Sequence, residues 1–377
     1  KIWNMALIIL AFVLSIFGTF LTRSGVLSSV HTFSETGMGP FFLGFILVTL
    51  IGSFALLLYR REELRSEAEM ESVVSRESTF LLNNLLLVGA TIAVFLGTVF
   101  PVISEAVRGT KISVGAPFYN QVNGPILLAL IILTGICSMI GWRRASKNNL
   151  LRNFLWPLGL AIVISVVLFL IGVRQWLALI ATFFCIFVVL TIFYEMARST
   201  RARHQMRGGN YARAFVGLIS ANKPRYGGYV VHIGVILIAI GVIGSAFFQV
   251  QSEAILKPGE SMSIGKYNLT YEGIDNYLTE RKNITSATLS VTNTNSGDPI
   301  AKMVPLKYVT PTSEQPTTEV AIRSTLLEDL YVILIGWDPD GSASFKVMVN
   351  PAVNGLWMGG WVVLIGGLIA FWPDRRE

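Results

Sequence analysis

Three histidines are the residues of this sequence best suited to metal chemistry, and each lies in a different setting. His232 lies about one turn inside a long apolar segment, where an ionisable side chain is costly and needs a partner. The sequence therefore leaves two interpretations of His232: an axial ligand to haem iron, or a neutral imidazole hydrogen-bonded to a neighbouring helix. His31 lies in a semi-apolar stretch where interfacial water can satisfy it, and His204 lies among arginines and is predicted to be solvated.

The composition places these histidines in a membrane protein. Of the 377 residues 53% are hydrophobic and only 14% are charged, where an ordinary soluble domain carries about a quarter charged residues. Two cysteines are too few for a disulfide-stapled domain, and no phosphate-binding loop, nucleophile elbow or paired intramembrane carboxylate is present. No aromatic-interleaved basic domain accompanies the net charge of +7, so nucleic acid is not expected as a partner.

Uninterrupted apolar length predicts a polytopic α-helical membrane protein with about eight transmembrane helices. The predicted spans are Trp3–Leu21, Phe41–Leu58, Phe80–Phe100, Pro125–Trp142, Phe154–Gly172, Trp176–Tyr194, Tyr229–Phe248 and Leu356–Trp372. Five glycines in the last span predict close packing against another helix, which could come from a missing part of the protein; these are Gly355, Gly359, Gly360, Gly366 and Gly367.

The basic residues divide unevenly between the two sets of connections, which is the usual signal of topology. One set holds Lys1, Arg60, Arg61, Arg65, Arg76, Arg143, Arg144, Lys147, Arg152, Arg198, Arg201, Arg203, Arg207, Arg213, Lys223, Arg225, Arg375 and Arg376. The other short loops hold only Arg23, Arg108, Lys111 and Arg174. Both ends are therefore predicted to be cytoplasmic, and the loops 22–40 and 101–124 and the segment 249–355 to face outward.

The depth of the histidines limits how they could bind haem. His232 follows the cytoplasmic end of its span by a few residues, whereas His31 lies on an outward loop, so about 30 Å of hydrocarbon separates the two levels. If both are ligands there are two haems, and each needs a second axial ligand. Within this chain only His204 or a methionine could be the second axial ligand, so the missing histidines would have to come from an upstream or partner chain.

Residues 249–355 form a small β-rich domain by prediction. Short alternating stretches replace the long apolar runs, and Pro- and Gly-containing turn signals separate roughly seven strands, enough for a small sandwich or barrel. The domain has no histidine, cysteine or nucleophile motif, which favours docking or shaping over independent catalysis. The predicted organisation is a seven-helix bundle over 1–248, a periplasmic β-rich domain over 249–355, and a final helix with a cytoplasmic tail over 356–377.

Several long motifs resemble a known family. Residues 18–31, GTFLTRSGVLSSVH, resemble the segment that follows the tryptophan-rich WWD motif in the CcmF family of cytochrome c haem lyases. The likeness continues in the Asn83-Asn84 pair and in 97–101 GTVFP, 113–120 SVGAPFYN, 226–234 YGGYVVHIG and 350–361. These motifs are spread over nearly the whole chain.

The resemblance implies an enzyme of cytochrome c maturation that takes haem from the haem chaperone CcmE and attaches its vinyl groups, through thioether bonds, to the CxxCH cysteines of apocytochrome c. It implies that His31 is an axial ligand to the substrate haem, that His232 is an axial ligand to a resident haem b, and that His204 binds neither. It also implies CcmH- and CcmI-type subunits as partners and the bacterial inner membrane as location, with the mitochondrial inner membrane as an alternative.

One departure concerns the first part of the family pattern. The WWD motif and the first outward and first membrane histidines should precede Trp3, and they are absent. With no initiator methionine either, we expect the chain to be the C-terminal portion of a longer or split protein, whose N-terminal half is then a required partner. No general base for the thioether chemistry is evident, so the catalytic residues stay unidentified.

Outward cations have two possible roles. Arg23, Arg108 and Lys111 could pair with haem propionates, or they could contact lipid headgroups. Three other functions also remain open at this point: a non-catalytic haem carrier or exporter subunit of the same pathway, a secondary transporter with His232 as a proton relay, and a quinol-oxidising cytochrome b subunit. The transporter hypothesis lacks a visible inverted repeat, and the cytochrome b hypothesis leaves His31 without a role.

Overall fold

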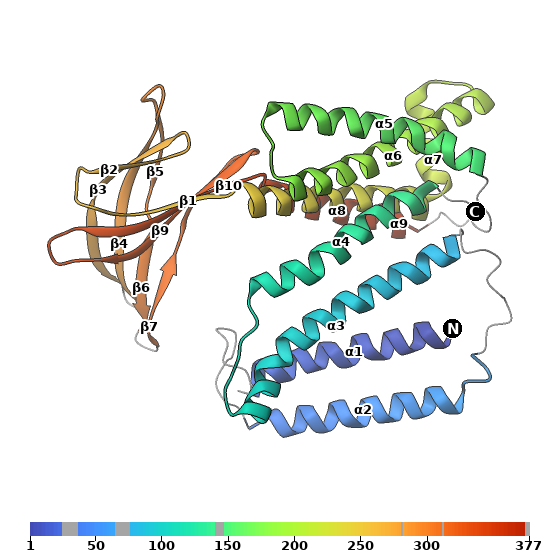
Figure 1. The fold of residues 1–377 in the computed structure, drawn as a ribbon, viewed down its shortest axis with the longest axis horizontal. Coiled ribbons are helices and arrows are strands. Elements are labelled where there is room, and N and C mark those ends of the chain that lie inside the picture. The colour runs from blue at the N-terminus through green and yellow to red at the C-terminus, as the bar shows by residue number, and fades with distance from the viewer. Residues whose placement is uncertain (25–36, 65–75, 140–146, 280–281, 311–312, 374–377) are drawn as a thin grey trace. The chain divides into compact units, whose positions relative to one another are not determined.

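The computed structural model describes residues 1–24, 37–64, 76–139, 147–279, 282–310 and 313–373. Eight helices in these ranges are long and apolar enough to cross a membrane, which confirms the predicted fold class. They are α1 (Ile2–Arg23), α2 (Gly39–Tyr59), α3 (Arg76–Arg108), α4 (Ala116–Met139), α5 (Lys147–Ile171), α6 (Trp176–Arg207), α8 (Lys223–Phe248) and α9 (Asn354–Phe371) (Figure 1). The short helix α7 (Tyr211–Ala221) joins α6 to α8.

Three helices extend well beyond their predicted apolar segments. α3 continues through Pro101, and α4 begins nine residues before Pro125. Proline inside a span is tolerated where neighbouring groups satisfy the freed backbone carbonyl, so the prolines did not mark helix ends here. α6 continues thirteen residues past Tyr194 through an arginine-rich sequence, because straight-chain charged residues are good helix formers once they leave the apolar zone.

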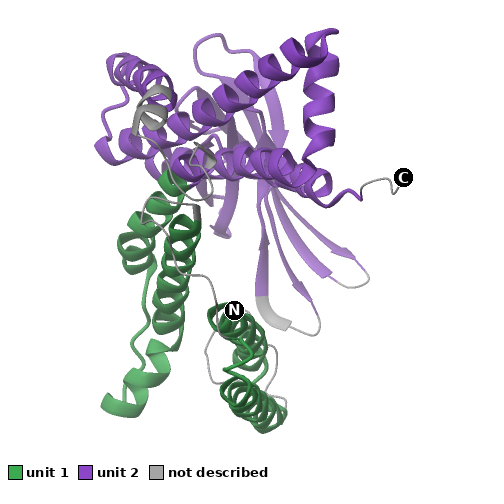
Figure 2. Cartoon of the chain, turned by 90° about the vertical axis from the view of Figure 1, so that its right-hand side faces the viewer, with its two compact units in different colours: residues 1–133, 140–146 green, residues 134–139, 147–377 purple. Residues whose placement is uncertain are grey.

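The chain divides into two compact units (Figure 2). The first unit, residues 1–133 with 140–146, contains α1 to α3 and most of α4. Aromatic contacts join α1 to its neighbours: Phe12 meets Phe45 of α2 with ring centroids 6.5 Å apart, and Phe17 meets Phe95 of α3 at 5.4 Å. Most large apolar side chains of these helices are exposed, as expected for surfaces that meet lipid or another chain.

The second unit, residues 134–139 with 147–377, is built around the antiparallel pair α8 and α9. Glycines bring the two backbones together: a Cβ at Gly234 would stand 2.7 Å from the carbonyl oxygen of Gly359, and one at Gly366 would stand 2.5 Å from the amide nitrogen of Val231. Small residues allow this approach in membrane helices. The glycine-rich face predicted for the last span therefore packs on α8 of the same chain, while Gly360 and Gly367 face open space.

A β sandwich stands between α8 and α9 in the sequence. Ten strands, rather than the seven predicted, form two sheets among the described residues. One sheet has the order β1-β10-β9-β8 and the other β2-β3-β4-β6-β7, with β5 paired to β4. Several strands are only four or five residues long, too short to give a clear alternating pattern. The strands are β1 (Val250–Leu256), β2 (Ser261–Ile264), β3 (Tyr267–Thr279), β4 (Lys282–Asn293), β5 (Pro299–Met303), β6 (Leu306–Thr310), β7 (Ser313–Glu319), β8 (Ala321–Ser324), β9 (Glu328–Trp337) and β10 (Ala343–Pro351).

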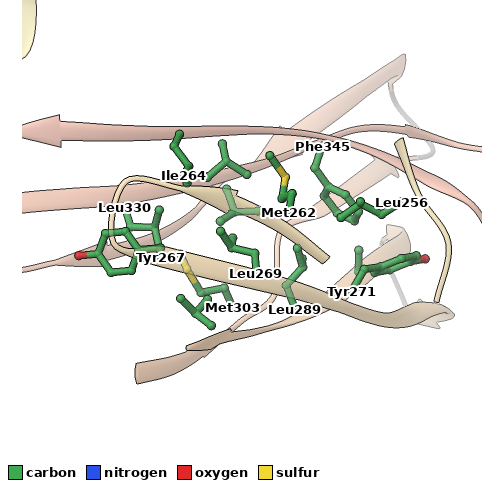
Figure 3. Packing of buried hydrophobic residues seen from close by; sticks show 14 of the residues in the cluster. Leu256, Met262, Ile264, Tyr267, Leu269, Tyr271, Leu289, Met303, Leu330 and Phe345 are labelled. Carbon is green, nitrogen blue, oxygen red and sulfur yellow. The ribbon is translucent and has the colours of Figure 1, made fainter. Parts of the chain in front are cut away.

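The core of the sandwich is apolar and draws on both sheets (Figure 3). Leu269 and Leu289 come from the larger sheet, Leu330 and Phe345 from the smaller one, and all four are fully buried. The Tyr271 and Phe345 rings meet edge to face across the sheets with centroids 5.1 Å apart. Alternate residues point inward along β2, the first half of β3 and most of β10, which is the pattern that the sequence indicated.

Candidate functional site

His232 lies on the face of α8 that is turned away from the glycine contacts with α9. At 3.6 residues per turn, Arg225, Tyr229, His232 and Ile236 share one face of the helix, and Gly234 lies on the opposite face. Arg225 on this shared face bonds to α6, and Tyr229 and Ile236 are buried. The tight pairing of α8 with α9 and the ion pair with α6 together fix the rotation of α8, and hence the direction in which His232 points.

One ring nitrogen of His232 is buried without a partner. Nδ1 has no hydrogen bond among the described residues, although the side chain as a whole is partly exposed. A buried polar atom without a partner is costly, so this arrangement gives no support to the interpretation of His232 as a neutral residue bonded through Nδ1 to a neighbouring helix. Because the side chain is partly exposed, it is accessible to a ligand that approaches from outside the helix pair.

The surroundings of His232 leave room beside the imidazole. Gly228 lies one turn before His232 on the same side of α8, the direction in which helical side chains point. A Cβ placed at Gly228 would meet no atom within 4 Å. This fits a planar group lying against the helix next to His232. No cluster of three or more His, Cys, Asp or Glu side chains occurs in the described parts of the chain.

A buried charge cluster lies two turns from His232 along α8. The carboxylate of Glu195 on α6 is only 4% exposed and accepts hydrogen bonds from Arg225 at 2.9 Å and from Arg198 at 2.6 Å. Arg225 also donates to the Tyr229 hydroxyl, and Arg198 donates to the side chain of Asn153 on α5. The seven residues from Arg225 to His232 correspond to about 10 Å along the axis. The cluster locks α5, α6 and α8 together two turns from the histidine.

Sequence reasoning missed this cluster. Glu195 follows directly after the predicted sixth span, where a charged residue normally marks the membrane surface. Its arginine partners lie 3 and 30 residues away, and Arg198 in turn bonds to Asn153, which is 45 residues from it; only the folded bundle brings these residues together. The one signal in the sequence was that Glu195 is an acidic residue followed by several arginines, which could have indicated an ion pair.

His204 lies in the last turn of α6 and not in a loop, which corrects the expectation for this residue. Its ring stacks on Tyr211 of α7 with centroids 4.1 Å apart, and Nδ1 is buried without a hydrogen-bond partner. The stacking with Tyr211 withdraws the ring from water, which explains why it is not simply solvated. It joins α6 to α7.

The outward candidates belong to the first unit. His31 lies outside the described residues. Arg23 is the last residue of α1, and Arg108 is exposed at the C-terminal end of α3, in a helix rather than in a loop as expected. A basic residue at a helix C-terminus is favoured by the helix dipole, which accounts for both positions. Lys111 pairs with Glu105 at 3.5 Å, so it is already engaged within the chain.

Known proteins of similar sequence were found for both the β sandwich and the whole chain. Residues 247–351 match the family described as the CcmF C-terminal beta-sandwich. The whole chain is 31% identical over 379 residues to the cytochrome c-type biogenesis protein CcmF of Haemophilus influenzae, covering 57% of that protein. It is also 31% identical over 383 residues to the cytochrome c-type biogenesis protein ccl1 of Rhodobacter capsulatus, covering 56% of it.

A solved structure agrees with the sequence comparisons. The protein named "Cytochrome c Heme Lyase CcmF" superposes with a TM-score of 0.74 and 25% identity, over 99% of this chain and 55% of that one. The chain thus spans a little over half the length of the relatives that it matches. These findings confirm the resemblance to CcmF along the whole chain.

Proposed function

We propose that this chain, which resembles CcmF over its full length, is the C-terminal portion of a membrane haem lyase of cytochrome c maturation. The observation that carries the proposal is His232, placed on a partly open face of a membrane helix with one ring nitrogen buried and unpaired. The likeness to proteins named for cytochrome c biogenesis supplies the pathway in which such a ligand would act.

In this proposal His232 is one axial ligand of a resident haem b. When bound, that haem would supply an electron to keep the iron of the substrate haem ferrous. The chain's own contribution is rigid placement of the imidazole, through the α8–α9 glycine contacts on one side and the ion pair between Arg225 and Glu195 on the other. The second axial ligand would come from the N-terminal half.

The substrate haem would be held on the outward side with His31 as an axial ligand. The reaction adds a cysteine S–H across each vinyl double bond: sulfur bonds to one vinyl carbon and hydrogen to the other, with no net change in oxidation state. The lyase would accelerate this addition mainly by holding ring and thiol in register. Arg23, Arg108 and Lys111 are proposed to pair with the propionates, and Lys111 would have to exchange its ion pair with Glu105 to do so.

The orientation that we propose puts the β sandwich in the periplasm. Arg198, Arg225 and the other cations of α6 to α8 lie toward the end of the second unit opposite the sandwich, because α8 runs from Lys223 to the sandwich at Phe248. The positive-inside rule assigns that end to the cytoplasm. The bundle then comprises residues 1–248, the periplasmic domain 249–355 and the final helix 356–377, with the haem chaperone, apocytochrome c and CcmH- or CcmI-type subunits as periplasmic partners.

The lyase proposal is tested by trapping the thioether product. The complete assembly, with its N-terminal half, is supplied with haem-loaded chaperone and apocytochrome c. We expect haem that stays on the cytochrome through acid-acetone extraction and denaturing electrophoresis, and we expect its loss in a His31→Ala variant. His204→Ala serves as the matched control, because this ring stacks on Tyr211 away from both proposed haems. Haem that binds the assembly but is always extractable would instead identify a carrier.

A further inference from the structure

The turn between β8 and β9 carries two exposed leucines. In the turn Thr325–Glu328, Leu326 and Leu327 occupy the two central positions and are 75% and 78% exposed. Central turn positions usually hold Gly, Pro, Asn, Asp or Ser, which suit the backbone and face water. Two adjacent leucines at such a tip therefore point to an apolar environment outside the protein.

Hydrogen bonds hold this turn in one conformation. The backbone N–H and the hydroxyl of Thr325 donate to the carbonyl of Glu328 at 3.1 and 2.6 Å, and the Glu328 N–H donates to the Thr325 hydroxyl at 3.1 Å. The Glu328 carboxylate accepts hydrogen bonds from the Tyr267 hydroxyl at 2.8 Å and from Lys266 at 2.7 Å. With its base fixed in this way, the turn holds the leucines away from the sandwich core.

The same turn is tied to the start of the last membrane helix. The N–H of Ala352 donates to the Leu327 carbonyl at 2.7 Å, and the side chain of Asn354, the first residue of α9, donates to the Thr325 carbonyl at 3.0 Å. Trp357 lies three residues further, about 4.5 Å along the helix, and is 70% exposed. An exposed tryptophan at the end of a span marks the interfacial zone of a bilayer.

We propose that Leu326 and Leu327 insert into the interfacial zone of the lipid bilayer and so dock the β sandwich onto the membrane surface. The partner is lipid, because the hydrogen bonds to Ala352 and Asn354 keep the turn level with the point where α9 enters the apolar zone. A chain tethered at α8 and α9 alone could tilt about these two connections. The leucine contact adds a third point of support and restricts that tilt.

A fluorescent label on the turn tests this contact in the complete assembly in lipid nanodiscs. Leu326→Cys or Leu327→Cys is labelled with the environment-sensitive fluorophore NBD in a Cys137→Ala background, since Cys185 is fully buried in α6. The matched control is Asp340→Cys, in the turn at the far end of β9, ten residues or about 33 Å away. Nitroxide-bearing lipids and a water-soluble quencher are then added separately.

We expect the lipid nitroxide to quench the label at 326 or 327 several-fold more than the label at 340, and aqueous iodide to show the opposite order. Equal access of iodide to all three positions would overturn the proposal, because the turn would then face water. Protection from both quenchers would also overturn it, since the turn would then be covered by protein. The experiment reads only the surroundings of the turn and not the binding of haem, so a failure here leaves the proposed function untouched.

Discussion

Replacing Gly359 by alanine should separate α8 from α9, and the neighbouring Gly360 provides the control. A Cβ at 359 would stand 2.5 Å from the carbonyl oxygen of Gly234 and 2.6 Å from a side-chain carbon of Ile238. Ordinary contacts begin at 3.4 Å, so the helices must move apart by about 0.9 Å at this point. A Cβ at 360 meets no atom within 4 Å.

Apart from this contact with α8, Gly359→Ala and Gly360→Ala have the same effect on the helix. Both gain the advantage of about 1 kcal/mol that alanine has over glycine in a helix. Only Gly359→Ala overpacks a tight interface, which costs about 1–3 kcal/mol. We therefore expect Gly359→Ala to be less stable than Gly360→Ala by about 1–3 kcal/mol.

The difference is measured by unfolding the purified chain in mixed micelles with increasing SDS, followed by tryptophan fluorescence. Each variant is compared with wild type under the same lipid and detergent conditions. If Gly359→Ala and Gly360→Ala unfold at the same SDS fraction, the two helices are not packed through these glycines. α8 would then not be held by these glycines, and the rotation that directs His232 would lack this support.

Three further predictions follow from buried groups. Glu195→Gln should destabilise the bundle by about 1–3 kcal/mol in thermal unfolding, because it leaves Arg225 without its carboxylate. Adding Arg225→Gln to this variant should recover part of the loss. If the losses of stability of the two single variants simply add in the double variant, the ion pair contributes nothing. Burial alone would raise the pKa of Glu328, but hydrogen bonds from Lys266 and Tyr267 outweigh it and hold the pKa below its ordinary value of 4.5. The contribution of the ionised Glu328 carboxylate to stability is therefore complete above about pH 4.5 and is lost as the pH falls through the lower pKa of the folded state. Glu328→Gln should make the stability of the protein depend less on pH in this acid range, as followed by circular dichroism. An unchanged pH dependence in the variant would contradict this role. Phe345→Ala should cost about 3–5 kcal/mol in denaturant unfolding, and a loss below about 1 kcal/mol would mean that the sandwich core relaxes around the cavity.

Apolar length and alternation were enough to predict most of the fold. Eight spans and a β-rich segment follow from where water must be excluded, because a backbone in lipid has to satisfy its own hydrogen bonds. The same reasoning singled out His232, since a polar ring within an apolar run demands a partner. Its position relative to Arg225 follows from helical periodicity alone.

Features that depend on distant residues could not be predicted. The glycines of the last span showed that a helix would pack closely there, but not that the partner is α8 of the same chain. Glu195 became important only once α5, α6 and α8 came together around it. His204 was misplaced because the apolar pattern ends at Tyr194 while the helix does not.

The reduced-minus-oxidised visible spectrum of the complete assembly tests the central claim most directly. The wild type, His232→Ala and the control His204→Ala are purified with the N-terminal half present. The account predicts a six-coordinate b-type signal in the wild type and in His204→Ala, and its loss in His232→Ala. A signal of unchanged shape and intensity in His232→Ala would contradict the account, because His232 could then not be an axial ligand of the resident haem.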